Sequence, residues 1–412
     1  MNNALALALH GGPRAVTAHA PTHHRWGAEE RERLSAMVDQ RSLFYWQGPQ
    51  TAALLEEFRQ LYALRWCMPC SSGTASLHIA VAALRLPPGS EVITSPVTDM
   101  GSVIGILYQQ CVPVFADIDP GTYNLDPAAI RRAITPKTRA IMVVHLAGNP
   151  SDMEAIMAIA REHDLLVIED CAQSWGAQFR GTPVGLFGHL ACYSLNEFKH
   201  ISCGDGGIVG TNDERFGPTL TKWGDKHYDR VSGGRNPETL SPNYRISEPQ
   251  AAVAAAQMRK LPAIISTHIR LGRRLLDRIA TLGVSGLLPP TIDPRDTHSF
   301  WFCLFRLRQG ALRCSRDEFV AALKAEGVAC TAGYIPRPVY GYPLFQNHDF
   351  FAGHWPLREA GLTSMDYRTV RCPNAEAMLA EGISVAISPA LTDEIIDQTA
   401  DAFAKVARHF AL

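Results

Sequence analysis

The sequence has almost no net charge, and this limits the partners that it can bind. Its 412 residues include 39 basic and 40 acidic side chains, so the formal net charge is −1. Binding to nucleic acid or to an anionic membrane by charge requires a basic excess, which this chain lacks. Apolar residues make up 46% of the chain and charged residues 19%, a composition typical of a large folded core and not of a disordered chain. We expect two or three domains, or one large domain with a smaller companion.

The ten cysteines form no regular disulfide framework. Cys111, Cys192 and Cys303 lie inside apolar runs, which is typical of buried, reduced thiols in an intracellular protein. Cys67 and Cys70 have the spacing of a redox or metal pair, but no second pair and no nearby histidine completes a zinc site. We therefore expect no bound metal.

The chain also lacks a long apolar run. The N-terminal stretch 1–14 contains a short apolar segment, but no basic region precedes it and it is too short for a secretory signal or a membrane helix. The expectation is a cytoplasmic protein with no membrane partner.

Short, wholly apolar runs alternate with helical segments through the first half of the chain. The runs comprise residues 91–93, 112–116, 141–144, 165–168, 190–193 and 207–209. Strands that are apolar on both faces, with helices such as 151–163 between them, predict a mainly parallel sheet covered on both sides. Ligands of such sheets bind beyond the carboxyl ends of the strands, so the residues that follow each run are the candidates for a site.

The second half of the chain predicts a smaller unit. Residues 214–247 form an irregular, Gly- and Pro-rich excursion, and long excursions of this kind are often functional. A long helix over 248–281 follows. The elements expected after it are a strand at 300–307, a helix opened by the capping box Ser315-x-x-Glu318, and a final helix from Thr392. This composition indicates a C-terminal α+β domain.

One candidate site is the turn Ser71–Thr74, at the start of a predicted helix. Small residues there expose backbone N–H groups beside the positive end of the helix dipole, an arrangement that suits a phosphate. Ser-Gly-Thr is also an ordinary helix cap, so Gly73 and Thr74 are weak indicators when taken alone.

A second candidate is Asp170 with Gln173, directly after a buried run. A carboxylate at that edge can keep a pyridine nitrogen protonated, which turns the ring into an electron sink. Gln173 can donate a hydrogen bond to a phenolic oxygen of such a ring. In isolation, a helix cap with a surface glutamine explains the same residues equally well.

A third candidate is Lys199, which follows another run and lies between Phe198 and the Gly-rich segment 204–207. Desolvation there would lower the pKa of the amine and leave it neutral, as imine formation requires. Taken alone, a surface lysine is the default. A fourth stretch, 241–245, has the pattern of a turn before the long helix.

The order of these motifs resembles the DegT/DnrJ/EryC1/StrS family of sugar aminotransferases. The motifs are the phosphate turn, Asp170-x-x-Gln173, Ser194-x4-Lys199, Gly-Asp-Gly-Gly at 204–207 and Asn243-x-Arg245. The resemblance covers most of the chain and implies the fold type I of pyridoxal-phosphate (PLP) enzymes, a three-layer α/β fold with a mainly parallel sheet and a smaller C-terminal α+β domain. It implies an N-terminal segment over 1–45 packed on the body, a PLP-binding domain over 46–260 and a small domain over 261–412.

The resemblance also implies how the cofactor phosphate is held. Thr74 and Ser194 would bind it, with the Gly73 turn in support. Asn243 would reach the phosphate of the neighbouring subunit, which implies a homodimer with shared active sites.

The resemblance likewise implies how the cofactor ring is held. Asp170 would pair with the pyridine nitrogen, Gln173 would contact the 3-hydroxyl, and Lys199 would form the Schiff base. The expected reaction moves an amino group from glutamate or glutamine through pyridoxamine phosphate to a keto sugar or keto-cyclitol, in amino-sugar or secondary-metabolite biosynthesis. Lys199 would act as general base and acid.

Three other functions compete with this one. A keto-sugar dehydratase of the same fold has histidine in place of the lysine, whereas here Lys199 keeps the position and the histidine is His200. A PLP-binding regulator without turnover has no need of the complete set that ends in Lys199. A nicotinamide-dependent dehydrogenase would need a Gly-x-Gly-x-x-Gly turn after the first predicted strand, which is missing.

The sequence departs from the family's pattern at two places near the expected substrate. Where the family usually has an aromatic residue that stacks on the cofactor ring, this chain has Asp99, which can instead contact a substrate amine or a sugar hydroxyl. The loop that often carries Arg-x-His-Gly reads differently over 222–228. Substrate recognition is therefore expected to differ from that of the common nucleotide-sugar members.

Overall fold

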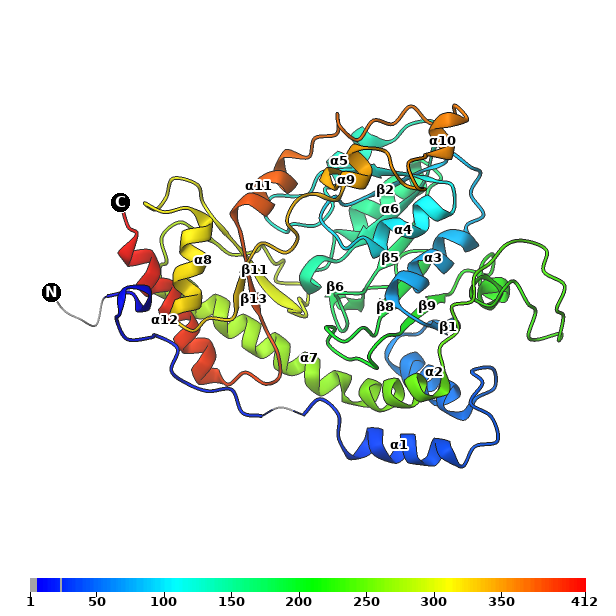
Figure 1. The fold of residues 1–412 in the computed structure, drawn as a ribbon, viewed down its shortest axis with the longest axis horizontal. Coiled ribbons are helices and arrows are strands. Elements are labelled where there is room, and N and C mark those ends of the chain that lie inside the picture. Colours follow the sequence, from blue (N-terminus) through cyan, green and yellow to red (C-terminus); the bar gives the residue numbers. More distant parts are fainter. Residues whose placement is uncertain (1–5, 23) are drawn as a thin grey trace.

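A seven-stranded sheet forms the centre of the larger part of the molecule (Figure 1). The computed structural model describes residues 6–22 and 24–412, so the first five residues of the N-terminal stretch lie outside it. The strands are β1 (Trp66–Cys70), β2 (Glu91–Thr94), β3 (Val112–Phe115), β4 (Thr138–Val144), β5 (Leu166–Asp170), β8 (Leu190–Ser194) and β9 (Gly207–Thr211). Their order is β1-β9-β8-β5-β4-β2-β3; β9 is antiparallel to both neighbours and the remaining pairs are parallel. The predicted mainly parallel sheet is confirmed.

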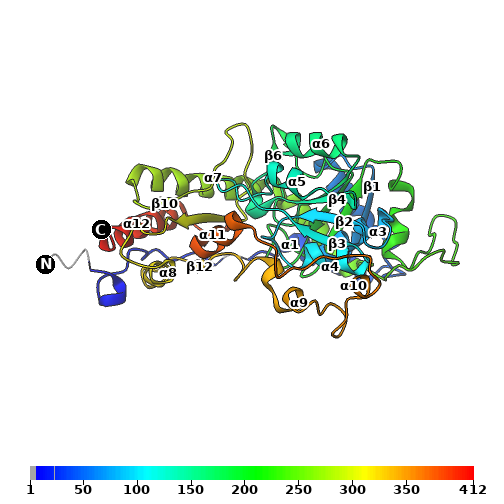
Figure 2. The same cartoon turned by 90° about the horizontal axis from the view of Figure 1, so that it is seen from above.

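Helices cover both faces of this sheet because its strands are apolar on both sides. In β4, for example, Met142 packs with one layer and Ile141 with the other. One layer contains α3 (Gly73–Ala83) and α4 (Gly101–Tyr108). The opposite layer contains α2 (Pro49–Leu61), α5 (Pro127–Ala133), α6 (Met153–Glu162) and the first half of α7 (Glu248–Leu282). Figure 2 shows α5 and α6 across the sheet from α3 and α4. These are the three layers that the alternating runs predict.

Helix α7 joins the two sheets of the protein. It is 35 residues long and is capped by Ser247, whose N–H donates to Gln250 Oε1 at 3.1 Å. Ala251–Met258 belong to the core under the large sheet, whereas Leu271–Ile279 belong to the second core. The expected domain boundary after residue 260 thus falls within one continuous helix.

The second sheet has four antiparallel strands in the order β10-β11-β13-β12. Its strands are β10 (Leu287–Leu288), β11 (Phe302–Leu307), β12 (Cys330–Ala332) and β13 (Gly382–Ala386). The helices α8 (Arg316–Ala325) and α12 (Asp393–His409) pack on it together with α7. The predicted caps are present, because Ser315 accepts from Glu318 N at 3.2 Å and Thr392 accepts from Ile395 N at 3.3 Å.

The chain between β12 and β13 returns to the large sheet. It contains α9 (Pro343–Gln346), α10 (Pro356–Glu359) and α11 (Pro373–Glu381). Its aromatic side chains Phe345 and Tyr367 pack on Phe115 of β3, and the Tyr367 hydroxyl donates to Pro113 O at 2.9 Å. Residues 333–381 therefore cover the large sheet although they interrupt the small one.

The N-terminal segment lies along both parts of the molecule (Figure 1). Ala8 N and Ala15 N donate to Glu326 in the small part, and α1 (Ala28–Val38) lies beside α7, where Glu30 pairs with Lys260 at 2.6 Å. Over the described part of the chain, no helix combines the length and the hydropathy of a membrane span.

Candidate active site

The candidate residues meet at one edge of the large sheet. Strands β1, β5 and β8 end there, at Cys70, Asp170 and Ser194, because β1 and β8 are both antiparallel to β9 and hence run in the same direction as β5. A cavity of about 350 Å³ opens at this edge. Six of the seven predicted site residues line it: Gly73, Thr74, Asp170, Gln173, Ser194 and Lys199.

The start of α3 forms one wall of this cavity. Ser72 caps the helix, since its hydroxyl accepts from Ala75 N at 3.0 Å. The N–H groups of Gly73 and Thr74 have no acceptor among the described residues, so they are free for a ligand. A Cβ on Gly73 would lie 2.7 Å from the Cβ of Ser194, which means that only glycine lets the helix approach the end of β8 this closely. The side chain of Thr74 lies half-buried beside this contact.

Asp170 lies in the floor of the cavity with only 4% of its surface exposed. Its carboxylate accepts from the Ser102 hydroxyl at 2.7 Å and from Ala172 N at 3.0 Å. Burial raises the pKa of Asp170 above its usual range, while these two donors favour the charged form. Ser102 lies at the start of α4, and the sequence analysis did not single it out.

The Lys199 amine lies in the cavity wall. Burial lowers its pKa to about 8, and the negative charges of Asp170 and Asp99 oppose that shift. Its Nζ lies 3.8 Å from the ring centroid of Trp301, a cation–π distance. The Trp301 indole N–H donates to Phe198 O at 2.7 Å. Phe198 directly precedes Lys199, so this hydrogen bond holds the indole ring over the lysine.

A second cavity of about 510 Å³ lies on the other side of Lys199, between the large and the small sheet. Arg25 and His200 line it, and Arg25 donates to Lys199 O at 2.5 Å. His200 Nε2 donates to Ser299 O at 3.2 Å, and burial lowers the pKa of His200 well below its usual range. The imidazole next to the lysine is thus a buried, neutral group outside the first cavity.

Gln173 is held in one orientation by the residues around it. Its Oε1 accepts from Ala147 N at 2.9 Å, and its Nε2 donates to the Tyr334 hydroxyl at 2.9 Å. One N–H of the amide remains available. Tyr334 comes from the segment after β12, and no pattern in the sequence connects it with Gln173.

Asn243 and Asp99 differ from the other candidates. Asn243 is exposed and does not line the cavity of its own chain, although Tyr244 O next to it accepts from Ser71 N at 2.8 Å. Asp99 does line the cavity, where its Oδ1 accepts from Gly101 N at 2.8 Å.

The loop 222–228 is built around the buried carboxylate of Asp225. This carboxylate accepts from the Tyr45 hydroxyl at 2.7 Å, from Arg230 Nη2 at 3.0 Å and from Arg245 Nη1 at 2.9 Å. The irregular excursion is therefore anchored by charge, and Arg245 of the Asn-x-Arg motif belongs to that anchor.

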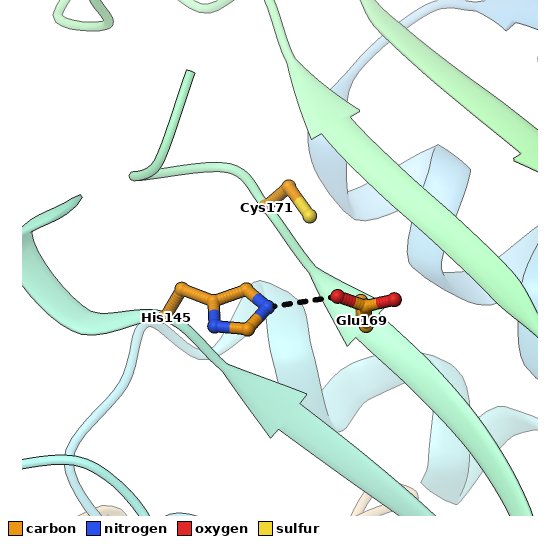
Figure 3. A group of neighbouring side chains, drawn as sticks. All are labelled: His145, Glu169 and Cys171. Carbon is orange, nitrogen blue, oxygen red and sulfur yellow. Dashed lines mark hydrogen bonds and ion pairs between the residues drawn. The ribbon is translucent and has the colours of Figure 1, made fainter. Parts of the chain in front are cut away.

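His145, Glu169 and Cys171 form a buried group at the ends of β4 and β5 (Figure 3). Each of the two Glu169 oxygens accepts two N–H donors. The donors are His145 Nε2 at 3.1 Å, Gly185 N at 2.7 Å, Phe187 N at 2.8 Å and Gly188 N at 2.5 Å. His145 Nδ1 accepts from Ser151 N at 3.1 Å, so Nε2 carries the proton. Both side chains are fully engaged in holding loops to the sheet, and this leaves no lone pair for an ion.

Cys67 and Cys70 are buried, free thiols. Burial raises the pKa of Cys67 to about 11 and that of Cys70 to about 12. Thiols of this kind are poor nucleophiles, so the spacing of the pair reflects packing in β1.

Comparisons with known proteins agree with the fold and identify the family. Residues 25–404 match the sequence profile of the DegT/DnrJ/EryC1/StrS aminotransferase family. The chain is 34% identical over 363 residues to a putative L-glutamine:3-amino-2,3-dideoxy-scyllo-inosose aminotransferase of Micromonospora echinospora. This alignment covers 86% of this chain and 85% of that protein. It is 35% identical over 350 residues to a pleiotropic regulatory protein of Geobacillus stearothermophilus, with 83% and 85% covered. The crystal structure of an aminotransferase from Psychrobacter cryohalolentis superposes with a TM-score of 0.84 at 27% identity and covers 95% of this chain and 99% of that one.

Proposed function

This chain belongs to the DegT/DnrJ/EryC1/StrS aminotransferase family, and we propose that it uses PLP to move an amino group from glutamine or glutamate to a keto sugar or keto-cyclitol. The observation that carries the proposal is the meeting of Lys199, Asp170 and the Gly73 turn around one cavity. The relative from Micromonospora echinospora supports glutamine as the donor and a keto-cyclitol as the acceptor.

The residues of the cavity fit PLP. The start of α3 offers free N–H groups and the positive end of a helix dipole to a phosphate, and Thr74 and Ser194 add hydroxyl groups. At the other end, the buried carboxylate of Asp170 suits a protonated ring nitrogen. Lys199, with its pKa lowered to about 8, supplies the neutral amine that an aldehyde needs.

When bound, PLP supplies an aldehyde that takes up the donor's amino group and a ring that accepts electron density. Asp170 would keep the ring nitrogen protonated, because its own hydrogen bonds from Ser102 and Ala172 favour the carboxylate. Lys199 Nζ would remove the proton from the donor's α-carbon and return it on the cofactor side. The remaining N–H of Gln173 would contact the phenolic oxygen of the ring.

We also propose a homodimer with shared active sites. Asn243 is exposed and lies outside the cavity of its own chain, yet it adjoins the residue that binds Ser71, as expected of a side chain that serves a neighbouring copy. A mixing experiment tests this point. Neither Lys199→Ala nor Asn243→Ala homodimers have an intact site, whereas each mixed dimer has one. After random exchange in an equal mixture, about half of the dimers are mixed, so about a quarter of all sites are restored. No recovery after verified subunit exchange would refute sharing.

The function itself is tested by absorbance and by half-reactions. The purified protein with PLP should show a visible cofactor band that Lys199→Ala abolishes and that the exposed control Lys137→Ala retains. Glutamine or glutamate should then convert the band to that of pyridoxamine phosphate. A wild-type band that neither donor changes would sink the proposal, and it would favour a regulator such as the relative from Geobacillus stearothermophilus.

A further inference from the structure

Asp99 carries a carboxylate oxygen that the protein itself does not use. Its Oδ1 accepts from Gly101 N at 2.8 Å, which fixes the side chain at the start of α4. Among the described residues, Oδ2 has no hydrogen-bond donor, and the exposed side chain lines the same cavity as Lys199. A fixed anion with one free oxygen therefore faces the site.

The other carboxylates of the cavity have partners. Asp170 accepts from Ser102 and Ala172, and Asp205 accepts from Asn196 Nδ2 at 2.9 Å. The side chains that line this cavity include three aspartates and one amine, that of Lys199. Among the described residues, Asp205 also keeps one oxygen without a donor, but the charges that act on the Lys199 amine are those of Asp170 and Asp99, and of these two Asp99 keeps a free oxygen.

The small domain faces Asp99 with two phenols. The pKa values of Tyr334 and Tyr342 are raised, first by burial and then by the charge of Asp99, so both rings lie within its field. Neither phenol is positively charged, whereas the positive charge of Arg337 lowers the pKa of Tyr342 and so opposes the effect of Asp99 there. The phenols therefore leave the charge of Asp99 unneutralised, and a positive group that comes to Oδ2 is attracted to it.

A negative charge at this place disfavours the amino donor. Glutamine carries one carboxylate and glutamate carries two, and each is repelled by Asp99. A serine or asparagine would bind a neutral hydroxyl equally well without that repulsion. Besides holding the start of α4 and acting on the pKa of Lys199, the charge gains a binding partner if the acceptor brings a positive group to Oδ2.

Resting on the proposed function, we propose that Asp99 determines acceptor specificity by binding an ammonium group. The acceptor is then a keto-cyclitol or keto sugar that already carries an amine, and the enzyme installs a second amine on it. The contact is a charge-assisted hydrogen bond from the acceptor's ammonium to Asp99 Oδ2.

The test compares two ketones that differ in one group. The probes are 3-amino-2,3-dideoxy-scyllo-inosose and 2-deoxy-scyllo-inosose, which has a hydroxyl in place of the amine. We expect wild-type enzyme to prefer the amino ketone by at least about tenfold in kcat/KM, mainly through KM. The variant Asp99→Asn keeps an oxygen for Gly101 N but has no charge, and it should lose this preference. Asp205→Asn, in the same cavity, should keep it.

A binding measurement supplies a readout that does not depend on turnover. The diamine 2-deoxystreptamine should bind the wild type loaded with pyridoxamine phosphate, which has no aldehyde to react with an amine, at least about tenfold more tightly than Asp99→Asn in calorimetry. The donor half-reaction of this variant should run at least as fast as that of the wild type, because the repulsion of the donor's carboxylate is removed.

Each alternative result overturns the inference. Equal use of the two ketones by the wild type, or use of neither while the donor half-reaction proceeds, would remove the ammonium contact and leave the aminotransferase function standing. An equal loss in both half-reactions of Asp99→Asn would place the carboxylate on the cofactor instead. Failure of the donor half-reaction in the wild type would contradict the proposed function itself.

Discussion

The substitution Glu169→Gln should destabilise this protein strongly although it changes one atom. Glu169 is fully buried in β5, next to Asp170, and its two oxygens accept four N–H groups. Glutamine keeps one oxygen and therefore two of these bonds. Its NH2 group then faces the other two donors, whichever way the amide turns. His145 cannot relieve the conflict by moving its proton, because its Nδ1 already accepts from Ser151 N.

The size of the effect follows from these contacts. A buried donor that loses its acceptor costs about 1–3 kcal/mol, and two donors are affected. Removing the buried charge offsets part of this cost. We expect a net loss of about 2–4 kcal/mol in the free energy of unfolding.

The assay is urea unfolding at saturating PLP, followed by intrinsic fluorescence. With a slope near 3 kcal/mol per M, the midpoint should fall by roughly 1 M while the slope stays the same. The control Glu162→Gln lies at an exposed salt bridge with Arg131 and should leave the midpoint in place. A metal chelator should likewise have no effect on the wild type. An unchanged midpoint for Glu169→Gln would refute the hydrogen-bond account, and a chelator-dependent midpoint would reveal a metal at this group.

Three further predictions concern the cavity and the excursion. Gly73→Ala places a methyl group against Ser194, so α3 must shift, and PLP should bind at least about tenfold more weakly in a fluorescence titration. An unchanged affinity for PLP would contradict the close contact between the start of α3 and the end of β8. The pKa of Lys199 is lowered to about 8, and only the neutral amine attacks the aldehyde, so the rate of PLP capture by the apoenzyme should rise through about pH 8 and level off above it. Stopped-flow absorbance measures this rate, and an inflection of the rate near the ordinary pKa of lysine would contradict the prediction. Asp225→Asn removes the charge between Arg230 and Arg245, so the free energy of unfolding should fall by about 2–4 kcal/mol and limited proteolysis should cut residues 214–247 faster. Equal cleavage rates for the variant and the wild type would refute the role of Asp225 in holding this segment.

Several site residues could be predicted because each is marked by local sequence. Asp170 and Lys199 follow apolar runs, and strands buried on both faces leave polar residues only where they end. Gly73 was found from its position at a helix start, although the tight contact with Ser194 that requires glycine was not.

Other residues of the site could not be predicted, because they reach it only through packing. Trp301 lies over Lys199 from 102 positions away in the chain, and Tyr334 meets Gln173 from a segment that leaves the small sheet. Ser102 lies nearer to the motifs, but a serine at the start of a helix does not reveal that it donates to Asp170.

The direction of β9 and the course of residues 333–381 were also undetermined by pattern. A strand that is buried on both faces has the same composition whether it runs parallel or antiparallel to its neighbours. The aromatic residues of the 333–381 segment indicate that it is buried, but not that it packs on Phe115 of the distant large sheet.

By itself, the sequence determined the layered α/β fold and the family and predicted the candidate lysine, because strand burial, helix caps and motif order are properties of short segments. The tertiary structure alone decided what surrounds that lysine. Its pKa near 8 depends on burial under Trp301 and on the distance to Asp170, and the free oxygen of Asp99 became visible only once its Oδ1 was seen to bind Gly101. Desolvation and charge interactions act through space, so they depend on which segments fold together and not on their order along the chain.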